Sequence, residues 1–172
     1  MLIGIISDTH DRLEAIAKAV SKLNELKVEI VIHCGDFISP FVVRELGKLN
    51  CKLIGVFGNN DGDKYTLTQK FSSVGFQLHD GPHIIEIDGL RVLILHGYRS
   101  PEMTVNIAYK LAETGKYDIV AYGHTHKYDK QKIGDTLVLN PGEVCGYLTH
   151  KSTMMILDTK RMEVKKITLQ EQ

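Results

Sequence analysis

The chain has 172 residues, of which 43% are hydrophobic and 24% are charged. This length predicts a single domain, residues 1–172, and this composition is that of a globular protein, not of a disordered one. The 21 basic and 21 acidic residues give a formal net charge of zero with histidine neutral. Zero net charge argues against a dedicated nucleic-acid surface and against binding to a membrane surface.

The three cysteines Cys34, Cys51 and Cys145 are too few for a disulfide framework and form no CxxC pair, so reduced thiols are expected. The N-terminal segment has no basic region before its apolar run, which argues against a secretory signal. No apolar run approaches the roughly 18 residues that cross a bilayer. We therefore expect a cytoplasmic protein. The sequence specifies no oligomeric state, and a homo-oligomer is compatible with it.

Strands and helices alternate in the first half of the chain. Three apolar runs predict buried strands: Leu2–Ser7, Glu29–His33 and Lys52–Phe57. The spacing of apolar residues predicts three helices: Asp11–Leu26, Ser39–Leu49 and Tyr65–Phe71. Asp11 is the predicted N-cap of the first helix, and Pro40 occupies the first turn of the second.

The second half contains more strands. They are predicted over His83–Ile87, Leu90–Leu95, Tyr117–Tyr122, Lys132–Ile133, Thr136–Leu139, Thr153–Leu157 and Met162–Ile167. An Asp88-Gly89 turn joins the first two into a hairpin, and Pro101–Glu113 is a predicted helix. A βαβαβ half is thus expected to meet a mostly antiparallel half. Because these apolar strands must be covered on both faces, the expected α/β fold is a four-layer α/β/β/α sandwich of two mixed sheets flanked by helices.

Five of the predicted strands end in an acid, an amide or a histidine. The segments that follow them are Asp8-Thr9-His10, Gly35-Asp36, Gly58-Asn59-Asn60-Asp61, His96-Gly97 and Gly123-His124-Thr125-His126. Ligands of α/β sheets bind at the carboxyl ends of the strands. Carboxylate, amide and imidazole groups suit Mn, Fe, Ni or Zn, and the missing thiolates disfavour a structural zinc site. Seven such groups exceed the need of one tetrahedral ion, so two ions that share a carboxylate are expected.

The spacing of these residues carries two structural expectations. The pairs Asp8/His10 and His124/His126 would each point to one side if the backbone stays extended. The glycines at 35, 58 and 123 would let the backbone turn sharply and approach other groups closely.

Each of these residues also has an alternative interpretation. A lone histidine at a strand end is more often a hydrogen-bonded structural residue, and Asp after Gly is usually a turn or a cap. The same arrangement at five strand ends favours the metal site. A calcium loop over residues 59–70 is excluded because Lys64 and Lys70 stand where Gly and Glu are required. An amidohydrolase barrel also uses HxH but needs about 250 residues.

In this order, the segments resemble the calcineurin-like metallophosphoesterase family, whose pattern is DxH, GD, GN followed by H and D or E, then H, then GHxH. The match covers residues 8 to 126, and Asn140-Pro141-Gly142 extends it to the small bacterial and archaeal phosphodiesterase branch. The resemblance implies the same four-layer sandwich. It implies a first metal on Asp8, His10, Asp36 and His126, and a second on Asp36, Asn59, His96 and His124, with Asp36 bridging.

Two positions depart from the family pattern. Asn60 stands where most phosphomonoesterases of the family have His, and an amide cannot donate a proton to a leaving group near pH 7. We therefore expect faster turnover of activated aryl diesters than of alkyl monoesters. Glu143 follows Asn-Pro-Gly where many relatives have Ser. It is either a charge beside the site or part of a solvated turn, and the solvated turn is the favoured interpretation.

Other polar residues receive structural interpretations. An exposed loop position is favoured for Arg99 over contact with a phosphate. His33 is expected in the core or supporting a ligand. Cys34 and Cys145 are expected to be small buried residues and not nucleophiles.

The predicted function is that of a phosphodiesterase that hydrolyses a small phosphodiester with a hydroxide bridging two divalent ions, Mn or Ni being favoured over Fe or Zn. The predicted catalytic residues are Asp36, Asn60 and Asp61. One alternative is a non-catalytic protein-binding scaffold on the same fold, similar to the retromer subunit, but scaffolds tend to lose ligands and all seven are present here. The other alternative, a phosphomonoesterase, is disfavoured by Asn60.

Overall fold

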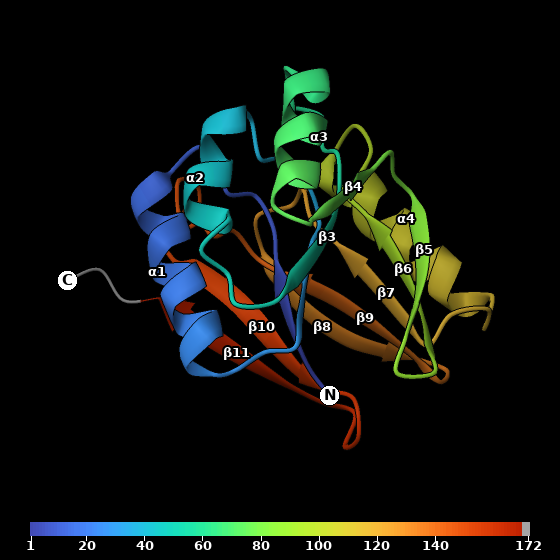
Figure 1. The fold of residues 1–172 in the computed structure, drawn as a ribbon. Coiled ribbons are helices and arrows are strands. Elements are labelled where there is room, and N and C mark those ends of the chain that lie inside the picture. Colours follow the sequence, from blue (N-terminus) through green and yellow to red (C-terminus); the bar gives the residue numbers. More distant parts are fainter. Residues whose placement is uncertain (170–172) are drawn as a thin grey trace.

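The strands form two sheets that pack face to face, as a computed structural model describing residues 1–169 shows (Figure 1). The first sheet has six strands in the order β11-β10-β1-β2-β3-β4. Their bounds are β1 Leu2–Ile6, β2 Ile30–His33, β3 Lys52–Val56, β4 Gln77–His79, β10 Ser152–Asp158 and β11 Glu163–Leu169. The second sheet has five strands in the order β5-β6-β7-β9-β8. Their bounds are β5 His83–Ile87, β6 Leu90–Leu95, β7 Ile119–Tyr122, β8 Tyr128–Ile133 and β9 Thr136–Pro141.

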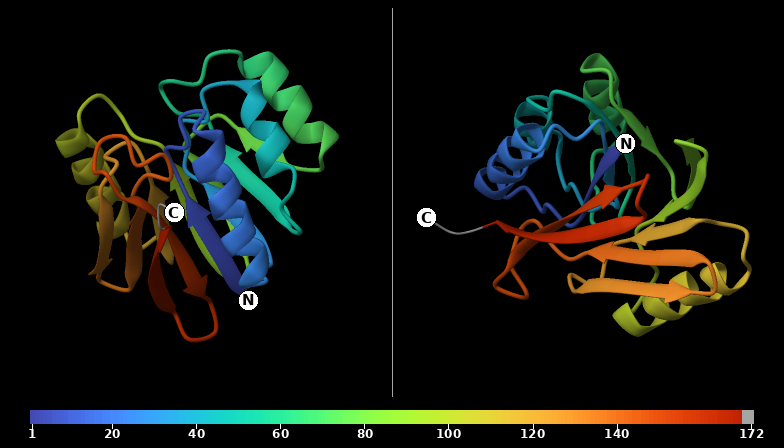
Figure 2. Two further views of the ribbon diagram at one scale, coloured as in Figure 1. Left: turned by 90° about the vertical axis from the view of Figure 1, so that its left-hand side faces the viewer. Right: turned by 90° about the horizontal axis from the view of Figure 1, so that it is seen from below.

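Helices cover the outer face of each sheet (Figure 2). Over the first sheet lie α1 (Leu13–Glu25), the 3-10 turn η1 (Pro40–Val42), α2 (Val43–Leu46) and α3 (Lys64–Ser73). Over the second sheet lies α4 (Pro101–Glu113), which packs on β7 and β9. Three apolar clusters fill the spaces between these layers. The cluster between the sheets includes Ile5, Ile32, Ile94 and Leu139. The predicted four-layer α/β/β/α sandwich of two mixed sheets is therefore confirmed.

The predicted division into an N-terminal and a C-terminal half is wrong for the C-terminal hairpin, β10 and β11. β10 and β11 join the first sheet, where β10 lies antiparallel to β1 and pairs Leu157 with Ile3. The side chains of β10 explain this position, because Met154 and Ile156 face the helices while Met155 and Leu157 face the other sheet. A strand that is apolar on both faces needs an interior place in a sheet.

The second sheet is also less antiparallel than expected. β6–β7 and β7–β9 are parallel pairs, and only the edge strands β5 and β8 run antiparallel to their neighbours. The carboxyl ends of β6 and β7 therefore lie side by side, as do those of β1, β2 and β3 in the first sheet.

Two of the predicted helices differ in detail. The predicted helix over Ser39–Leu49 is a 3-10 turn followed by a single α-helical turn. Asp11 is not the N-cap of α1, which begins after Arg12 without a side-chain cap. The Asp11 carboxylate instead accepts a hydrogen bond from the Ser39 amide at 3.3 Å. No helix within residues 1–169 combines the length and the apolar character that crossing a membrane requires.

Candidate metal centre

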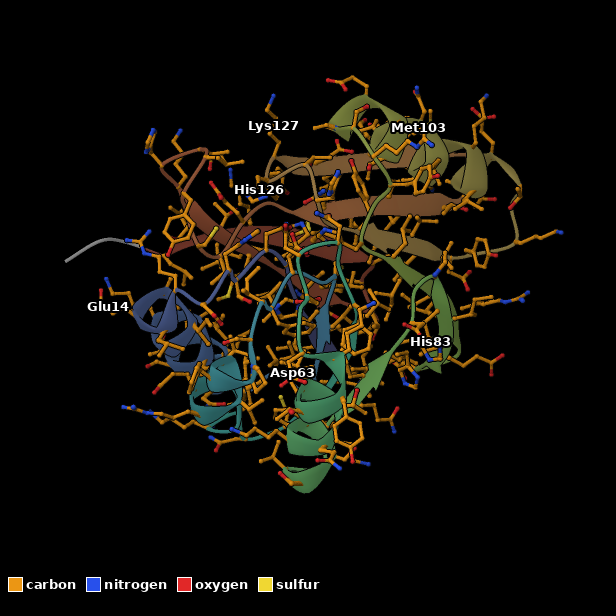
Figure 3. All side chains as sticks on the ribbon, turned by 90° about the horizontal axis from the view of Figure 1, so that it is seen from above. Glu14, Asp63, His83, Met103, His126 and Lys127 are labelled. Carbon is orange, nitrogen blue, oxygen red and sulfur yellow. The ribbon has the colours of Figure 1, made fainter. Side chains whose placement is uncertain are left out.

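All seven predicted ligands lie just beyond the carboxyl end of a strand. They follow β1 (Asp8, His10), β2 (Asp36), β3 (Asn59), β6 (His96) and β7 (His124, His126). Figure 3 looks down on this end of the molecule and labels His126 together with Glu14, Asp63 and Met103, which mark the starts of α1, α3 and α4. Both sheets thus deliver polar side chains to one place.

The first predicted set of ligands, Asp8, His10, Asp36 and His126, converges on a common point. The Nε2 atom of His10 lies 3.3 Å from Asp36 Oδ2 and 3.8 Å from Asp8 Oδ1. The Nε2 atom of His126 lies 3.4 Å from the same Asp8 oxygen. Neighbouring ligands of an ion with bonds of about 2.1 Å lie about 3 Å apart in octahedral and somewhat further apart in tetrahedral geometry.

The second predicted set, Asp36, Asn59, His96 and His124, is equally close. Asn59 Oδ1 lies 3.0 Å from His96 Nε2 and 2.8 Å from His124 Nδ1. His96 Nε2 lies 3.3 Å from Asp36 Oδ2, the oxygen that also faces His10. A single oxygen of Asp36 is therefore common to the two sets.

Two buried polar atoms test whether a cation fits the first set. Asp8 Oδ1 and His10 Nε2 are both buried, and neither has a hydrogen-bond partner among the residues that the structure describes. Buried polar atoms without partners are rare and call for an explanation such as an ion. Since each atom can donate an electron pair to a metal, and the donors are oxygens and imidazole nitrogens, the residues fit a divalent cation.

The charges in the site depend on one another. Burial by itself would raise the pKa of Asp36, but the imidazoles of His10 and His96 beside it hold the pKa well below its usual value. Burial would lower the pKa of His10, yet the partners Asp36 and Asp8 raise it to about 9. Without a cation, the two carboxylates thus keep a proton on the neighbouring imidazole.

The backbone at the ligands is left-handed and not extended, which corrects one expectation. Five of the predicted ligands have positive φ: Asp8 (53°), His10 (42°), Asp36 (61°), His124 (67°) and His126 (59°). The chain therefore turns sharply as soon as each strand ends, and this turn aims the side chains at the centre. The expected close approach at the glycines is confirmed, since a Cβ atom on Gly58 would overlap Asp36 Oδ1.

Asn60 and Asp61 make different contacts. The backbone N–H and the side-chain amide of Asn60 donate to the two oxygens of Asp36 at 2.9 and 2.7 Å. Asp61 is buried and accepts hydrogen bonds from the amides of Gly58, Ile38 and Asp36 at 2.6, 2.7 and 3.3 Å. Burial raises the pKa of Asp61. Its carboxylate therefore holds two loops together, whereas Asn60 touches the centre of the site.

Glu143 corrects the expectation of a solvated turn. Its side chain is fully buried, with 0% exposed, and one oxygen accepts a hydrogen bond from His126 Nδ1 at 2.7 Å. Burial alone would raise the pKa of Glu143, but the hydrogen bonds from His126, Thr149 and Cys145 lower it to about 2. The only signal in the sequence was an acid in place of Ser after Asn-Pro-Gly.

The remaining polar residues follow their structural interpretations. Arg99 is exposed, and its guanidinium lies 5.4 Å from the ring centre of Tyr98. His33 is fully buried between Thr9 Oγ1 at 3.2 Å and the amide of Gly35 at 3.1 Å. Cys34 and Cys145 are buried as expected, and Cys145 Sγ lies near the ring nitrogens of His10 and His126.

Comparison with known proteins gives one consistent family. Residues 1–162 match the calcineurin-like phosphoesterase superfamily domain. The phosphodiesterase MJ0936 of Methanocaldococcus jannaschii is 43% identical over 171 residues, which cover 99% of this chain and 100% of that protein. A probable metallophosphoesterase of Methanothermobacter thermautotrophicus is 33% identical over 170 residues, 96% of this chain and 91% of that protein.

Solved structures agree with this result. The structure of a novel archaeal phosphodiesterase has a TM-score of 0.89 and 44% identity, covering 98% of this chain and 100% of that one. A complex of Vps29 from Entamoeba histolytica with zinc has a TM-score of 0.67 and 18% identity, covering 99% of this chain and 100% of that one. The second likeness shows the shared fold alone.

Proposed function

The chain belongs to the calcineurin-like phosphoesterase superfamily, and we propose that it is a phosphodiesterase that uses two divalent metal ions. The family resemblance drawn from the sequence motifs is thereby confirmed. The observation that carries the proposal is the position of Asp36 Oδ2, which lies 3.3 Å from both His10 Nε2 and His96 Nε2. One carboxylate can therefore join two adjacent cation sites.

The proposed ligands divide as the motifs predict. Asp8, His10, Asp36 and His126 would hold the first ion, and Asp36, Asn59, His96 and His124 would hold the second. Bound divalent ions lower the pKa of water and stabilise negative charge that develops on a phosphate. Mixed oxygen and nitrogen ligation suits Mn, Ni, Fe or Zn, and Mn²⁺ and Ni²⁺ are the ions we propose to test first.

The chain's own residues position the substrate. The exposed amide of Asn60 lies against Asp36, so it can donate a hydrogen bond to a phosphate oxygen there. It has no acidic proton for the leaving group, which favours diesters with good leaving groups. Asp61, predicted to be catalytic, would act by holding the loops of Asp36 and Asn59 together.

A cavity beside His96 gives room for the ester group. Its volume is about 300 Å³. Its walls are largely apolar and include Phe57, Pro82, Leu95, Tyr98 and Ile107. Such a cavity suits an aryl group better than a charged one. This apolar wall and the amide of Asn60 both favour a small aryl diester over an alkyl monoester.

The alternative of a protein-binding scaffold is less well supported. All seven predicted ligands are present, and the donor atoms of neighbouring ligands lie 2.8 to 3.4 Å apart. A surface that only bound proteins would have no need for buried carboxylates that face buried imidazoles, since burying charged groups is costly.

Replacing Asp36 tests the proposal. The metal content per chain and the hydrolysis of a bis-aryl phosphate with added Mn²⁺ or Ni²⁺ should be measured for the wild type, Asp36→Asn and Asp63→Asn. We expect two ions per wild-type chain, and a loss of at least about 10²-fold in kcat/KM for Asp36→Asn, since a neutral amide is a much weaker shared ligand for both ions than a carboxylate. Asp63→Asn is the matched control because Asp63 is exposed and caps α3, a role that Asn also fills. An inert metal-loaded wild type would overturn the proposal.

A further inference from the structure

Glu143 sits at the centre of a network of hydrogen-bond donors. Its Oε2 accepts from His126 Nδ1 at 2.7 Å, from Cys145 Sγ at 3.1 Å and from the amide of Tyr147 at 3.1 Å. Its Oε1 accepts from the amide and hydroxyl of Thr149 at 2.6 and 2.8 Å and from the amide of Leu148 at 3.0 Å. The carboxylate thus joins the loop over residues 145–149 to a predicted metal ligand.

The contacts of Glu143 decide where the proton of His126 lies. Backbone N–H groups can only donate, so both oxygens of Glu143 act as acceptors, as in an ionised carboxylate. His126 must then carry a proton on Nδ1, and the lone pair of the neutral ring is on Nε2. That Nε2 is the atom that lies 3.4 Å from Asp8 Oδ1, on the side of the first predicted set of ligands.

The same loop is attached to the site at further points. The amides of Val144 and Cys145 donate to the carbonyls of Ser7 and Asp8 at 3.0 and 3.1 Å. Glu143 comes two residues after the end of β9, in a segment that these hydrogen bonds fix against the end of β1. The carboxylate has little freedom to move, which is the condition under which it can orient an imidazole.

We propose that Glu143 is a positioning residue, which holds His126 in the tautomer and orientation that present Nε2 to the first metal ion. The proposal rests on the proposed two-metal function. A carboxylate that accepts from the far nitrogen of a ligand histidine fixes the ring and makes it a better donor to the metal. The alternative is that Glu143 only stabilises the fold of the loop 145–149.

The variant Glu143→Gln separates these two roles. The side-chain amide of Gln has one oxygen and one NH2 group. In one orientation its NH2 would face the N–H of His126, and in the other it would face the N–H of Thr149, so one donor loses its acceptor in either case. We expect one of the two metal sites to bind about 10- to 100-fold more weakly, which is typical for the loss of such a partner, while the other site changes less than about twofold. Equilibrium dialysis of metal-free protein against graded Mn²⁺, with metal analysis per chain, measures both affinities.

Thr149→Val is the matched control. It removes the hydroxyl that donates to Glu143 Oε1 at 2.8 Å and leaves His126 and its contact intact. If Glu143 acts as proposed, Thr149→Val lowers the midpoint of thermal unfolding but leaves both metal affinities unchanged. Equal weakening of one metal site by both variants would show that Glu143 acts through the loop alone, and would overturn the proposal.

The tautomer of His126 gives a readout that needs no metal and no activity. In the wild type at alkaline pH, where a free imidazole is neutral, ¹⁵N NMR of the metal-free protein should show the proton of His126 on Nδ1. A proton on Nε2 in the wild type would overturn the proposal even if Glu143→Gln does not fold. In a folded Glu143→Gln, a shift of the tautomer towards Nε2–H is expected.

These outcomes are distinct from a failure of the proposed function. Wild-type protein that binds two ions but hydrolyses no diester would refute the phosphodiesterase and leave the role of Glu143 to be decided by metal affinity. Wild-type protein that binds no divalent ion would refute both.

Discussion

Asn60 is the residue that we expect to separate this site from that of a phosphomonoesterase. Its amide donates to Asp36 Oδ2 at 2.7 Å, so it lies at the point where the two predicted sets of ligands meet. An imidazole in the same place would be close enough to protonate a leaving group. The choice between amide and imidazole at this position should therefore set the preference between ester classes.

The variant Asn60→His is expected to gain activity on alkyl phosphate monoesters by about tenfold or more, because general acid catalysis contributes typically 10²–10⁴-fold and a new group is imperfectly placed. The measurement is the ratio of kcat/KM for an alkyl monoester to that for a bis-aryl diester. Asn60→Ala is the control, since it removes the amide without supplying an acid. An equal ratio for the two variants would contradict this role of position 60.

The polar residues at five strand ends, together with the family resemblance of their motifs, predicted the seven side chains that converge. They could not predict Glu143, because Asn-Pro-Gly-Glu has the local composition of a solvated turn. The burial of Glu143 depends on the loop 145–149 folding back over it with three backbone amides. Hydrogen bonds from a folded loop to a buried carboxylate leave no periodic pattern in the sequence.

At the scale of elements, the loop between β3 and α3 depends on Asp61. Its carboxylate accepts from the amide of Gly58 on its own loop, and from the amides of Ile38 and Asp36 on the neighbouring loop after β2. Ile38 is β-branched and has a φ of 86°, a conformation that needs support from outside the residue. One buried carboxylate therefore holds the two loops that carry Asp36 and Asn59.

We expect Asp61→Ala to lower the free energy of unfolding by roughly 2–4 kcal/mol, because buried backbone N–H groups would lose their acceptor. Urea denaturation of the metal-free protein measures the change. Asp61→Asn keeps one acceptor oxygen and should cost less than Asp61→Ala. Wild-type stability of the alanine variant would mean that these amides find another acceptor, contrary to this account.

Most elements were predictable because their apolar residues recur with the period of a strand or a helix. The three-residue strand β4 was missed, since Gln77–His79 is too short to show a period. The predicted helix over Ser39–Leu49 is a 3-10 turn and one α-helical turn, which ends at Leu46 with Gly47 as its C-cap. The position of β10 beside β1 was not predicted, because strands that follow each other in the chain are usually neighbours in a sheet, and β10 instead pairs with the first strand of the chain.

At the scale of the molecule, the predicted metal centre spans both sheets. Asp8, His10, Asp36 and Asn59 follow strands of the first sheet, and His96, His124 and His126 follow strands of the second. Cations bound there would bind the folded chain and not the unfolded one, so they should stabilise both sheets together.

Saturating Mn²⁺ should therefore raise the midpoint of thermal unfolding of the metal-free protein, by the equivalent of about 2.7 kcal/mol for one site at 100 times its Kd. A chelator should reverse the rise. In Asp36→Asn the rise should largely vanish, because a neutral amide is a much weaker shared ligand for two cations than a carboxylate. If Mn²⁺ stabilised Asp36→Asn as much as the wild type, the ions would be bound elsewhere.

The left-handed backbone at five of the predicted ligands lowers the stability of the fold. Aspartate and histidine are held at φ values of 42–67°, where most side chains cost roughly 1–2 kcal/mol relative to the right-handed region. Glycine adopts these values without strain, so His126→Gly should unfold at a higher urea concentration than His126→Ala, even though neither variant keeps the imidazole. A lineage that no longer needed the metals would be free to accept such replacements. These five positions therefore hold acid and imidazole groups at a cost in stability, so a chain that bound no metal would be more stable with glycine there.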